Sequence, residues 1–109
     1  PAMIRAAKKN FQHYKQKGEF SVADARKVIK KCDVIVTDPP YGRRASLHKV
    51  EVKNLYEGFL ENVYDHIDTV VLVIPNDLQV KSKYKVFFEA EEYIHKSLTR
   101  RIIILTKNI

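Results

Sequence analysis

Four consecutive residues, Asp38-Pro39-Pro40-Tyr41, combine groups that can bind a ligand at the end of a strand. The preceding residues 34–36 are β-branched and apolar, which is typical of a buried parallel strand. Each proline fixes its own φ and restricts the residue before it, so the chain leaves the strand as a rigid, extended turn. An acidic side chain, carbonyl acceptors and an aromatic ring are thereby held at the carboxyl end of the strand. Open α/β sheets bind their ligands at that edge.

Apolar patterns after this turn predict the elements that must hold it in place. Residues 50–67 have apolar side chains at helical spacing, and residues 69–75 form a continuous apolar run that indicates a second buried strand. Asn76 and Asp77 are expected to cap a short helix or turn that reaches Tyr84. Residues 86–95 and 101–106 then predict an antiparallel hairpin with a five-residue link. The helical stripe consists of Val52, Leu55, Tyr56, Phe59, Leu60, Val63 and Tyr64.

The chain before the turn predicts a helix, a short strand and a second short helix. Residues 3–17 have apolar side chains at helical spacing, and Gly18 is the expected C-terminal cap. Residues 20–25 alternate apolar and polar side chains as a strand does, and residues 25–31 are expected to form one or two helical turns leading into the central strand.

Composition indicates one small domain, residues 1–109, with an anionic partner. Lys and Arg number 20 against 13 Asp and Glu, which leaves a net charge of +7. Nucleic acid is the first candidate for that partner, and a solvated lysine-rich surface is the alternative. The single cysteine, Cys32, rules out a disulfide within the chain and indicates a reduced, cytoplasmic setting. No stretch has the length and apolarity of a membrane span, and no signal-peptide pattern is present.

The motif Asp38-Pro39-Pro40-Tyr41 resembles motif IV of the amino-group methyltransferases that use S-adenosylmethionine. The resemblance implies that the Asp38 carboxylate and the Pro39 carbonyl accept hydrogen bonds from an exocyclic amino group. It also implies that Tyr41 stacks on a flipped-out base. Such an amine is a poor nucleophile, and two fixed acceptors favour the pyramidal nitrogen that attacks the methyl group. The alternative is a rigid loop that only caps the strand.

A second resemblance concerns the cofactor. Residues 23–25, Ala-Asp-Ala, are similar to motif III of the same enzymes, which implies that Asp24 meets the adenine amino group and that Ala25 leaves room for the ring. Asp38 would border the same site, and the opening residues resemble a segment in which Met3 touches the adenine. Asp24 is equally well placed to act as an N-cap for the next helix, and both interpretations stay open.

Two basic segments point to RNA. Residues 93–101 resemble the closing hairpin of the tRNA guanosine N2-methyltransferases that carry an RNA-binding THUMP domain, which implies guanine N2 of tRNA as the target. Arg43, Arg44 and Lys49 follow the central motif and are candidates for binding nucleic acid. The alternative for these residues is a solvated surface loop.

By this resemblance the chain has a Rossmann-like α/β fold, the C-terminal portion of a class I methyltransferase sheet. That sheet is mostly parallel and ends in an antiparallel hairpin. The first two strands and the glycine-rich motif I are lacking, since Gly18, Gly42 and Gly58 lie far apart. We therefore expect a partial catalytic domain, inactive alone, whose cofactor site needs a missing N-terminal half or a second copy. Two alternatives remain: an adenine N6-methyltransferase acting on DNA or RNA, and a truncated basic nucleic-acid-binding or assembly module without catalysis.

Overall fold

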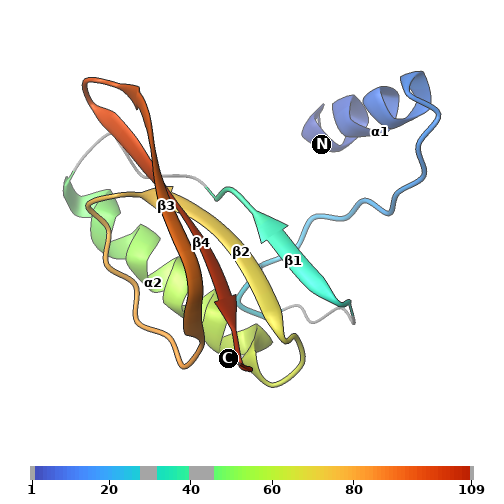
Figure 1. The fold of residues 1–109 in the computed structure, drawn as a ribbon. Coiled ribbons are helices and arrows are strands. Elements are labelled where there is room, and N and C mark those ends of the chain that lie inside the picture. Colours follow the sequence, from blue (N-terminus) through green and yellow to red (C-terminus); the bar gives the residue numbers. More distant parts are fainter. Residues whose placement is uncertain (1, 28–31, 40–45, 109) are drawn as a thin grey trace.

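The computed structural model describes residues 2–27, 32–39 and 46–108, with the backbone alone described for residues 46–50 (Figure 1). These ranges contain two helices and four strands. In chain order they are α1 (Ala2–His13), β1 (Val34–Thr37), α2 (Ser46–Tyr64), β2 (Thr69–Pro75), β3 (Lys85–His95) and β4 (Leu98–Thr106). None of the helices in these ranges combines the length and apolarity needed to cross a lipid bilayer.

The four strands form one sheet in the order β1-β2-β4-β3. β1 lies parallel to β2, with Val34 opposite Thr69 and Thr37 opposite Leu72. β4 lies between β2 and β3 and is antiparallel to both. The predicted α/β class with a C-terminal antiparallel hairpin is therefore confirmed.

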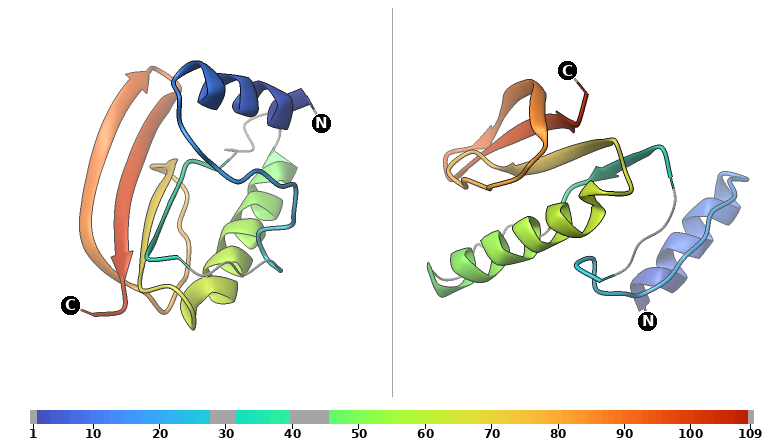
Figure 2. Two further views of the ribbon diagram at one scale, coloured as in Figure 1. Left: turned by 90° about the vertical axis from the view of Figure 1, so that its right-hand side faces the viewer. Right: turned by 90° about the horizontal axis from the view of Figure 1, so that it is seen from below.

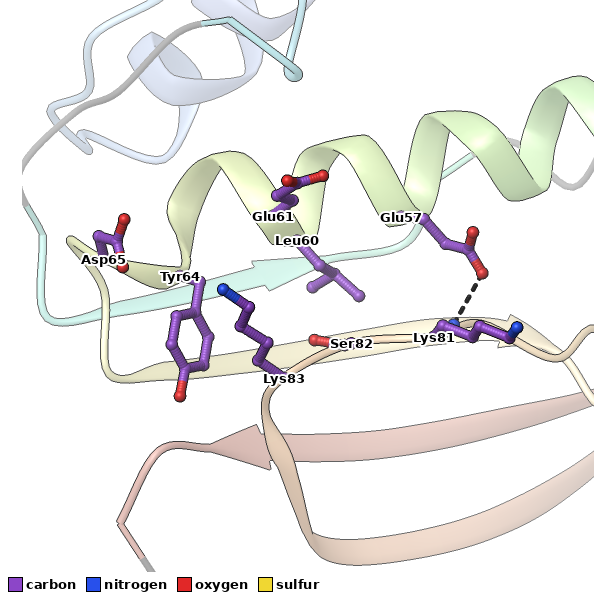
Figure 3. A pocket seen from close by; sticks show the side chains of 8 residues that line it. All are labelled: Glu57, Leu60, Glu61, Tyr64, Asp65, Lys81, Ser82 and Lys83. Carbon is purple, nitrogen blue, oxygen red and sulfur yellow. Dashed lines mark hydrogen bonds between the residues drawn. The ribbon is translucent and has the colours of Figure 1, made fainter.

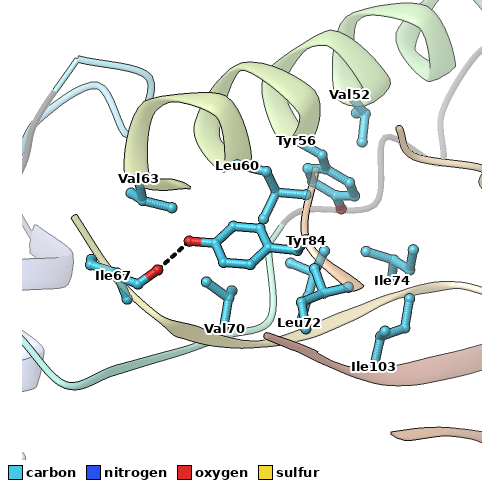
Figure 4. Packing of buried hydrophobic residues seen from close by; sticks show 11 residues of the cluster. Val52, Tyr56, Leu60, Val63, Ile67, Val70, Leu72, Ile74, Tyr84 and Ile103 are labelled. Carbon is cyan, nitrogen blue, oxygen red and sulfur yellow. Dashed lines mark hydrogen bonds between the residues drawn. The ribbon is translucent and has the colours of Figure 1, made fainter. Parts of the chain in front are cut away.

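One face of the sheet packs against α2, and their interface is the hydrophobic core (Figure 4). Tyr56 and Leu60 lie one turn apart on the same side of α2 and meet Leu72 and Ile74 of β2. Burying a Leu or Ile side chain stabilises a fold by roughly 1.5–3 kcal/mol, so this interface is the main source of stability. Every buried hydrophobic side chain of the described ranges belongs to it. The members are Val52, Tyr56, Leu60, Val63, Ile67, Val70, Leu72, Ile74, Tyr84, Ile103 and Leu105.

The opposite face of the sheet is apolar but no described helix covers it (Figure 2). Val34 and Val36 are 47% and 73% exposed, although the β-branched run predicted burial. Val71 and its partner Ile104 lie on the same face and are half-buried. The prediction of a buried strand was wrong because a strand is buried on both sides only where a layer packs on each face. β1 lies at the sheet edge, and among the described elements only one of its faces is covered.

α1 ends earlier than predicted, and Gly18 is not its cap. The N–H of Gln16 donates to the Phe11 carbonyl at 2.8 Å, and the N–H of Lys15 donates to the Gln12 carbonyl at 3.1 Å. Lys15 has a φ of 56°, the left-handed position that glycine usually occupies in this type of helix end. Gly18 instead packs closely on α1, and a Cβ there would lie 2.5 Å from the Phe11 ring, so that this ring would have to move.

Residues 20–25 form no strand, which corrects the prediction made for them. A strand needs a neighbour for its backbone hydrogen bonds, and no described strand pairs with this segment. Residues 25–27 form a turn, and the rest of the helix predicted for residues 25–31 lies outside the described residues.

The C-terminal hairpin is longer and tighter than predicted. Pairing continues to His95 opposite Leu98, so only Lys96 and Ser97 connect the two strands instead of the predicted five residues. Between β2 and β3, the predicted cap at Asn76 and Asp77 is a turn without a helix after it.

Tyr84 joins the segment before β3 to the core. Its hydroxyl donates a hydrogen bond of 2.6 Å to the Ile67 carbonyl (Figure 4), and its ring meets Tyr64 edge-to-face at a centroid distance of 4.8 Å. Burial raises the pKa of Tyr84 to about 12. The hydroxyl therefore stays protonated and remains a donor over the whole neutral range.

Replacing Tyr84 by Phe should lower the free energy of unfolding by about 1–2 kcal/mol, because the buried Ile67 carbonyl loses its donor. Urea unfolding followed by circular dichroism measures this. Tyr93→Phe, the same change at an exposed position of β3, is the control and should leave the unfolding midpoint in place. Equal midpoints for the two variants would contradict the role given to the Tyr84 hydroxyl.

Candidate functional site

The carboxyl end of β1 opens into a cavity of about 350 Å³. Asp38 and Pro39, the first half of the central motif, lie at its rim together with Ala25 from the turn before β1. The structure thus brings together two segments that the sequence analysis had singled out separately. The full lining consists of Ala25, Thr37, Asp38, Pro39, Leu55, Tyr56 and Phe59.

The wall of this cavity opposite the acidic rim is supplied by α2. Leu55 and Phe59 pack partly buried against the core, and Tyr56 is fully buried in it. The helical stripe therefore has two functions, because its central residues make the core and its flank forms the apolar wall of the cavity. An apolar wall facing a few oriented acceptors is the usual composition of a small-molecule site.

The turn that contains Asp24 is closed by its own arginine. Asp24 Oδ1 accepts hydrogen bonds from the backbone N–H of Arg26 at 2.9 Å and from its Nε at 3.0 Å, while Nη2 donates to Oδ2 at 2.9 Å. Chiefly through the side-chain hydrogen bonds, Arg26 lowers the pKa of Asp24 from 3.8 to about 2. Asp24 is therefore ionised, and its Oδ1 accepts from a backbone N–H within its own turn. The rest of the helix that it was predicted to cap lies outside the described residues.

Two contacts with α2 fix this turn in position. Asn62 Nδ2 donates to the Ala25 carbonyl at 3.2 Å. The aliphatic part of Arg26 lies so close to Gly58 that a Cβ there would be 3.1 Å from two of its carbons. A side chain at Gly58 would therefore require Arg26 to shift, a packing relation that the isolated place of Gly58 in the sequence did not indicate.

Asp38 contacts an arginine from the C-terminal hairpin. Arg100 Nη1 donates to Asp38 Oδ2 at 3.3 Å, and the same guanidinium binds Glu92 through Nε and Nη2. The sequence analysis had placed Arg100 in a connecting loop, whereas it belongs to β4, opposite Pro75 of β2. No spacing rule could have paired residues that are 62 positions apart in the chain.

The remaining predicted site residues are not brought to the cavity by described contacts. Met3 lies on α1, is 86% exposed and does not line the cavity. The side chain of Lys49 in α2 lies outside the described part of the chain. The same holds for four further residues in full, namely Pro40, Tyr41, Arg43 and Arg44.

A second hollow, of about 460 Å³, lies between α2 and the segment before β3 (Figure 3). Glu57 Oε2 accepts a hydrogen bond of 2.8 Å from the Lys81 backbone N–H, and Lys83 Nζ lies 5.8 Å from the centre of the Tyr64 ring. These contacts fasten the segment to the helix, and none of the predicted site residues takes part. In the described ranges no three His, Cys, Asp or Glu side chains are grouped as metal ligands.

Comparison with known proteins gives the family. Residues 1–101 match the domain family described as RMKL-like, methyltransferase domain. A tRNA (guanine(10)-N2)-dimethyltransferase of Methanothermobacter thermautotrophicus is 32% identical over 96% of this chain and 34% of its own length. Its namesake from Methanocaldococcus jannaschii is 36% identical over 72% of this chain and 21% of its own length.

A solved structure gives the fold. The crystal structure of a possible methylase from Clostridium difficile 630 matches 81% of this chain and 24% of its own, with a TM-score of 0.65 and 23% identity. At that identity the likeness concerns the fold alone. The chain spans about a third or less of the length of the curated relatives that it matches.

Replacing Arg26 by Gln should raise the pKa of Asp24 from about 2 toward its ordinary 3.8, because the side-chain hydrogen bonds that lower it are removed. A carboxyl whose pKa is lowered in the folded state stabilises that state at pH values above its ordinary pKa, and this stabilisation is lost as the pH falls from about 4 to about 2. In R26Q the free energy of unfolding should therefore change less with pH over this range. A ¹³C NMR titration of the carboxyl carbon measures the pKa. Arg5→Gln, at an exposed position of α1, is the control, and an unmoved pKa in R26Q would contradict the assignment.

Proposed function

Because the chain belongs to the RMKL-like methyltransferase domain family, we propose that it forms the C-terminal part of a catalytic domain that transfers a methyl group from S-adenosylmethionine to guanine N2 of tRNA. The observation that carries this proposal is the cavity at the end of β1, where Asp38 and Pro39 of the amino-methyltransferase motif meet Ala25. The names of the relatives support tRNA guanine as the target. The single cysteine supports a reduced cytoplasmic setting.

In this proposal Asp38 and the Pro39 carbonyl accept the two hydrogens of the guanine amino group, while Tyr41 stacks on the unstacked base. Pro39 and Pro40 hold these groups in one direction, since each restricts the residue before it. The amino nitrogen would then turn its lone pair toward the methyl carbon. An N–C bond would form as the S–C bond breaks and the sulfur leaves as a neutral thioether, and the nitrogen would then lose one proton to water. The catalytic contribution of the chain is positioning and charge complementarity, without a strong base.

The cofactor, when bound, supplies a methyl group made electrophilic by its sulfonium. The described residues fit its adenine end. A carboxylate offers about four acceptor sites, and Arg26 uses three with its donors, which leaves Asp24 able to meet an amino group. Ala25 and Phe59 line the cavity with a small and an apolar surface. Met3 is a further candidate contact for the adenine.

The uncovered face of the sheet supports a further proposal, that another stretch of polypeptide completes this domain. Val34 and Val36 lie exposed on that face beside half-buried Val71 and Ile104, and an apolar surface of this kind marks an interaction site. We propose that the remaining part of the enzyme, or else a second copy, covers this face. It would also supply the glycine-rich turn that the three isolated glycines of the sequence do not form.

The test is methyl transfer by a chimaera in which this chain replaces the matching part of the Methanothermobacter relative. Transfer to a tRNA transcript should yield N2-methylguanosine, identified by mass spectrometry. Asp38→Asn should then lower kcat by about 100–1,000-fold, because one oriented acceptor becomes a donor. Calorimetry should show nearly unchanged binding of S-adenosylmethionine.

Asp33→Asn, the same change before the opposite end of β1, is the matched control and should keep full turnover. N6-methyladenosine as the product would overturn the guanine assignment. Cofactor binding without any transfer would overturn catalysis and leave a nucleic-acid-binding module. Transfer by the unfused chain would assign the completion of the sheet to a second copy.

Arg43 and Arg44, with Lys49, are proposed to bind RNA phosphates beside the target pocket. Replacing both arginines by Ala should weaken tRNA binding and reduce the slope of log K against log salt by about 0.7–0.9 for each phosphate that is no longer neutralised. Filter binding at several salt concentrations measures the slope. Lys8→Ala with Lys9→Ala on α1 removes the same charge elsewhere. An equal slope in both double variants would mean that Arg43 and Arg44 do not bind RNA phosphates and are solvated instead.

A further inference from the structure

The two arginines next to each other in the hairpin have different environments. Arg101 turns toward the covered side of the sheet, where it pairs with Glu89 at 3.2 Å and donates to the Leu78 carbonyl at 2.9 Å. Arg100 turns to the other side and reaches Asp38 and Glu92. Arg101 is thus a structural residue of the fold, whereas Arg100 contacts the acid on which the proposed chemistry depends.

The backbone of Arg100 is held on both sides. It pairs with Pro75 of β2 on one side and with Glu92 of β3 on the other, so the base of its side chain cannot shift relative to the sheet. Asp38 is also constrained, because it follows the last residue of β1 and precedes Pro39. In Figure 1 the arrow of β1 points toward the end of the sheet at which the β3–β4 hairpin turns, which makes this contact possible.

We infer that Arg100 is the positioning residue for the Asp38 carboxylate, an inference that rests on the proposed function of Asp38. With both backbones held, the contact from Nη1 to Oδ2 at 3.3 Å selects the rotamer of the carboxylate. A guanidinium suits this task because its planar fork binds two acceptors in set directions. The β3–β4 hairpin thereby orients the Asp38 carboxylate, which accepts a hydrogen bond from the target amino group in the proposed function.

Glu92 binds the Arg100 guanidinium on the edge away from Asp38. Its Oε1 accepts from Nε of Arg100 at 3.1 Å and also from Nη2, so it takes one edge of the guanidinium and leaves the Nη1 side to Asp38. The positive charge is consequently shared between two carboxylates.

The experiment compares Arg100→Met, Arg100→Lys and the control Lys9→Met, at an exposed position of α1, in the active chimaera. R100M should lower kcat by about 100-fold, the cost of a displaced catalytic group, and should leave KM for S-adenosylmethionine and the melting temperature unchanged. R100K should recover part of kcat because it keeps the charge but lacks the fork. K9M should equal the parent protein. Full kcat in R100M would overturn the inference. If R100M does not fold, full kcat in R100K would overturn it instead.

A second readout does not depend on methyl transfer. Three-bond NMR couplings in the 109-residue chain report the χ1 rotamers of Asp38. One rotamer should dominate in the parent chain and in K9M, and R100M should show averaging over several. An unchanged coupling pattern in R100M overturns the inference. Absence of methyl transfer in the parent chimaera would instead overturn the proposed function, with the coupling still deciding the role of Arg100.

Discussion

The packing of α2 against one face of the sheet is the constraint on which the rest of this structure depends. The helix buries Tyr56 and Leu60 against β2 and β4, and the same helix lines the cavity at the end of β1 with Leu55 and Phe59. It also anchors the turn at residues 24–26 through Asn62 and Gly58. A change in the position of α2 would therefore displace the core, the cavity wall and the Asp24 turn together.

Both acids of the candidate site are held by arginines, but by different means. Arg26 binds Asp24 from two residues away, within a single turn, and lowers the pKa of this carboxyl to about 2. Arg100 reaches Asp38 from a distant part of the chain, and only the β4 position beside β2 brings it there. Asp24 is thus oriented locally, whereas Asp38 depends on the assembled sheet. The proposed methyl transfer would be correspondingly sensitive to distant changes in the hairpin.

The uncovered apolar face gives this domain an asymmetric character. The side that faces α2 is a packed hydrophobic core. The other side exposes Val34 and Val36 beside the half-buried Val71 and Ile104. The candidate site lies where these two sides meet, at the carboxyl end of β1. Under our proposal that further polypeptide covers the open face, this polypeptide would lie on the side of the sheet to which Arg100 turns.

The sequence by itself determined the elements with strong local signals. The stripe on α2 and the bounds of β2 follow from side-chain periodicity, and the restricted backbone at Asp38 follows from proline geometry. The α/β class followed from the family resemblance. Tertiary structure alone decided the exposure of β1, the absence of a strand at residues 20–25, the helix end at Lys15 and the contact between Arg100 and Asp38. Two physical reasons account for these cases. Burial, strand pairing and ion pairing depend on a neighbour from elsewhere in the chain, and the left-handed residue of a helix end depends on backbone hydrogen bonds that residue type only weakly indicates.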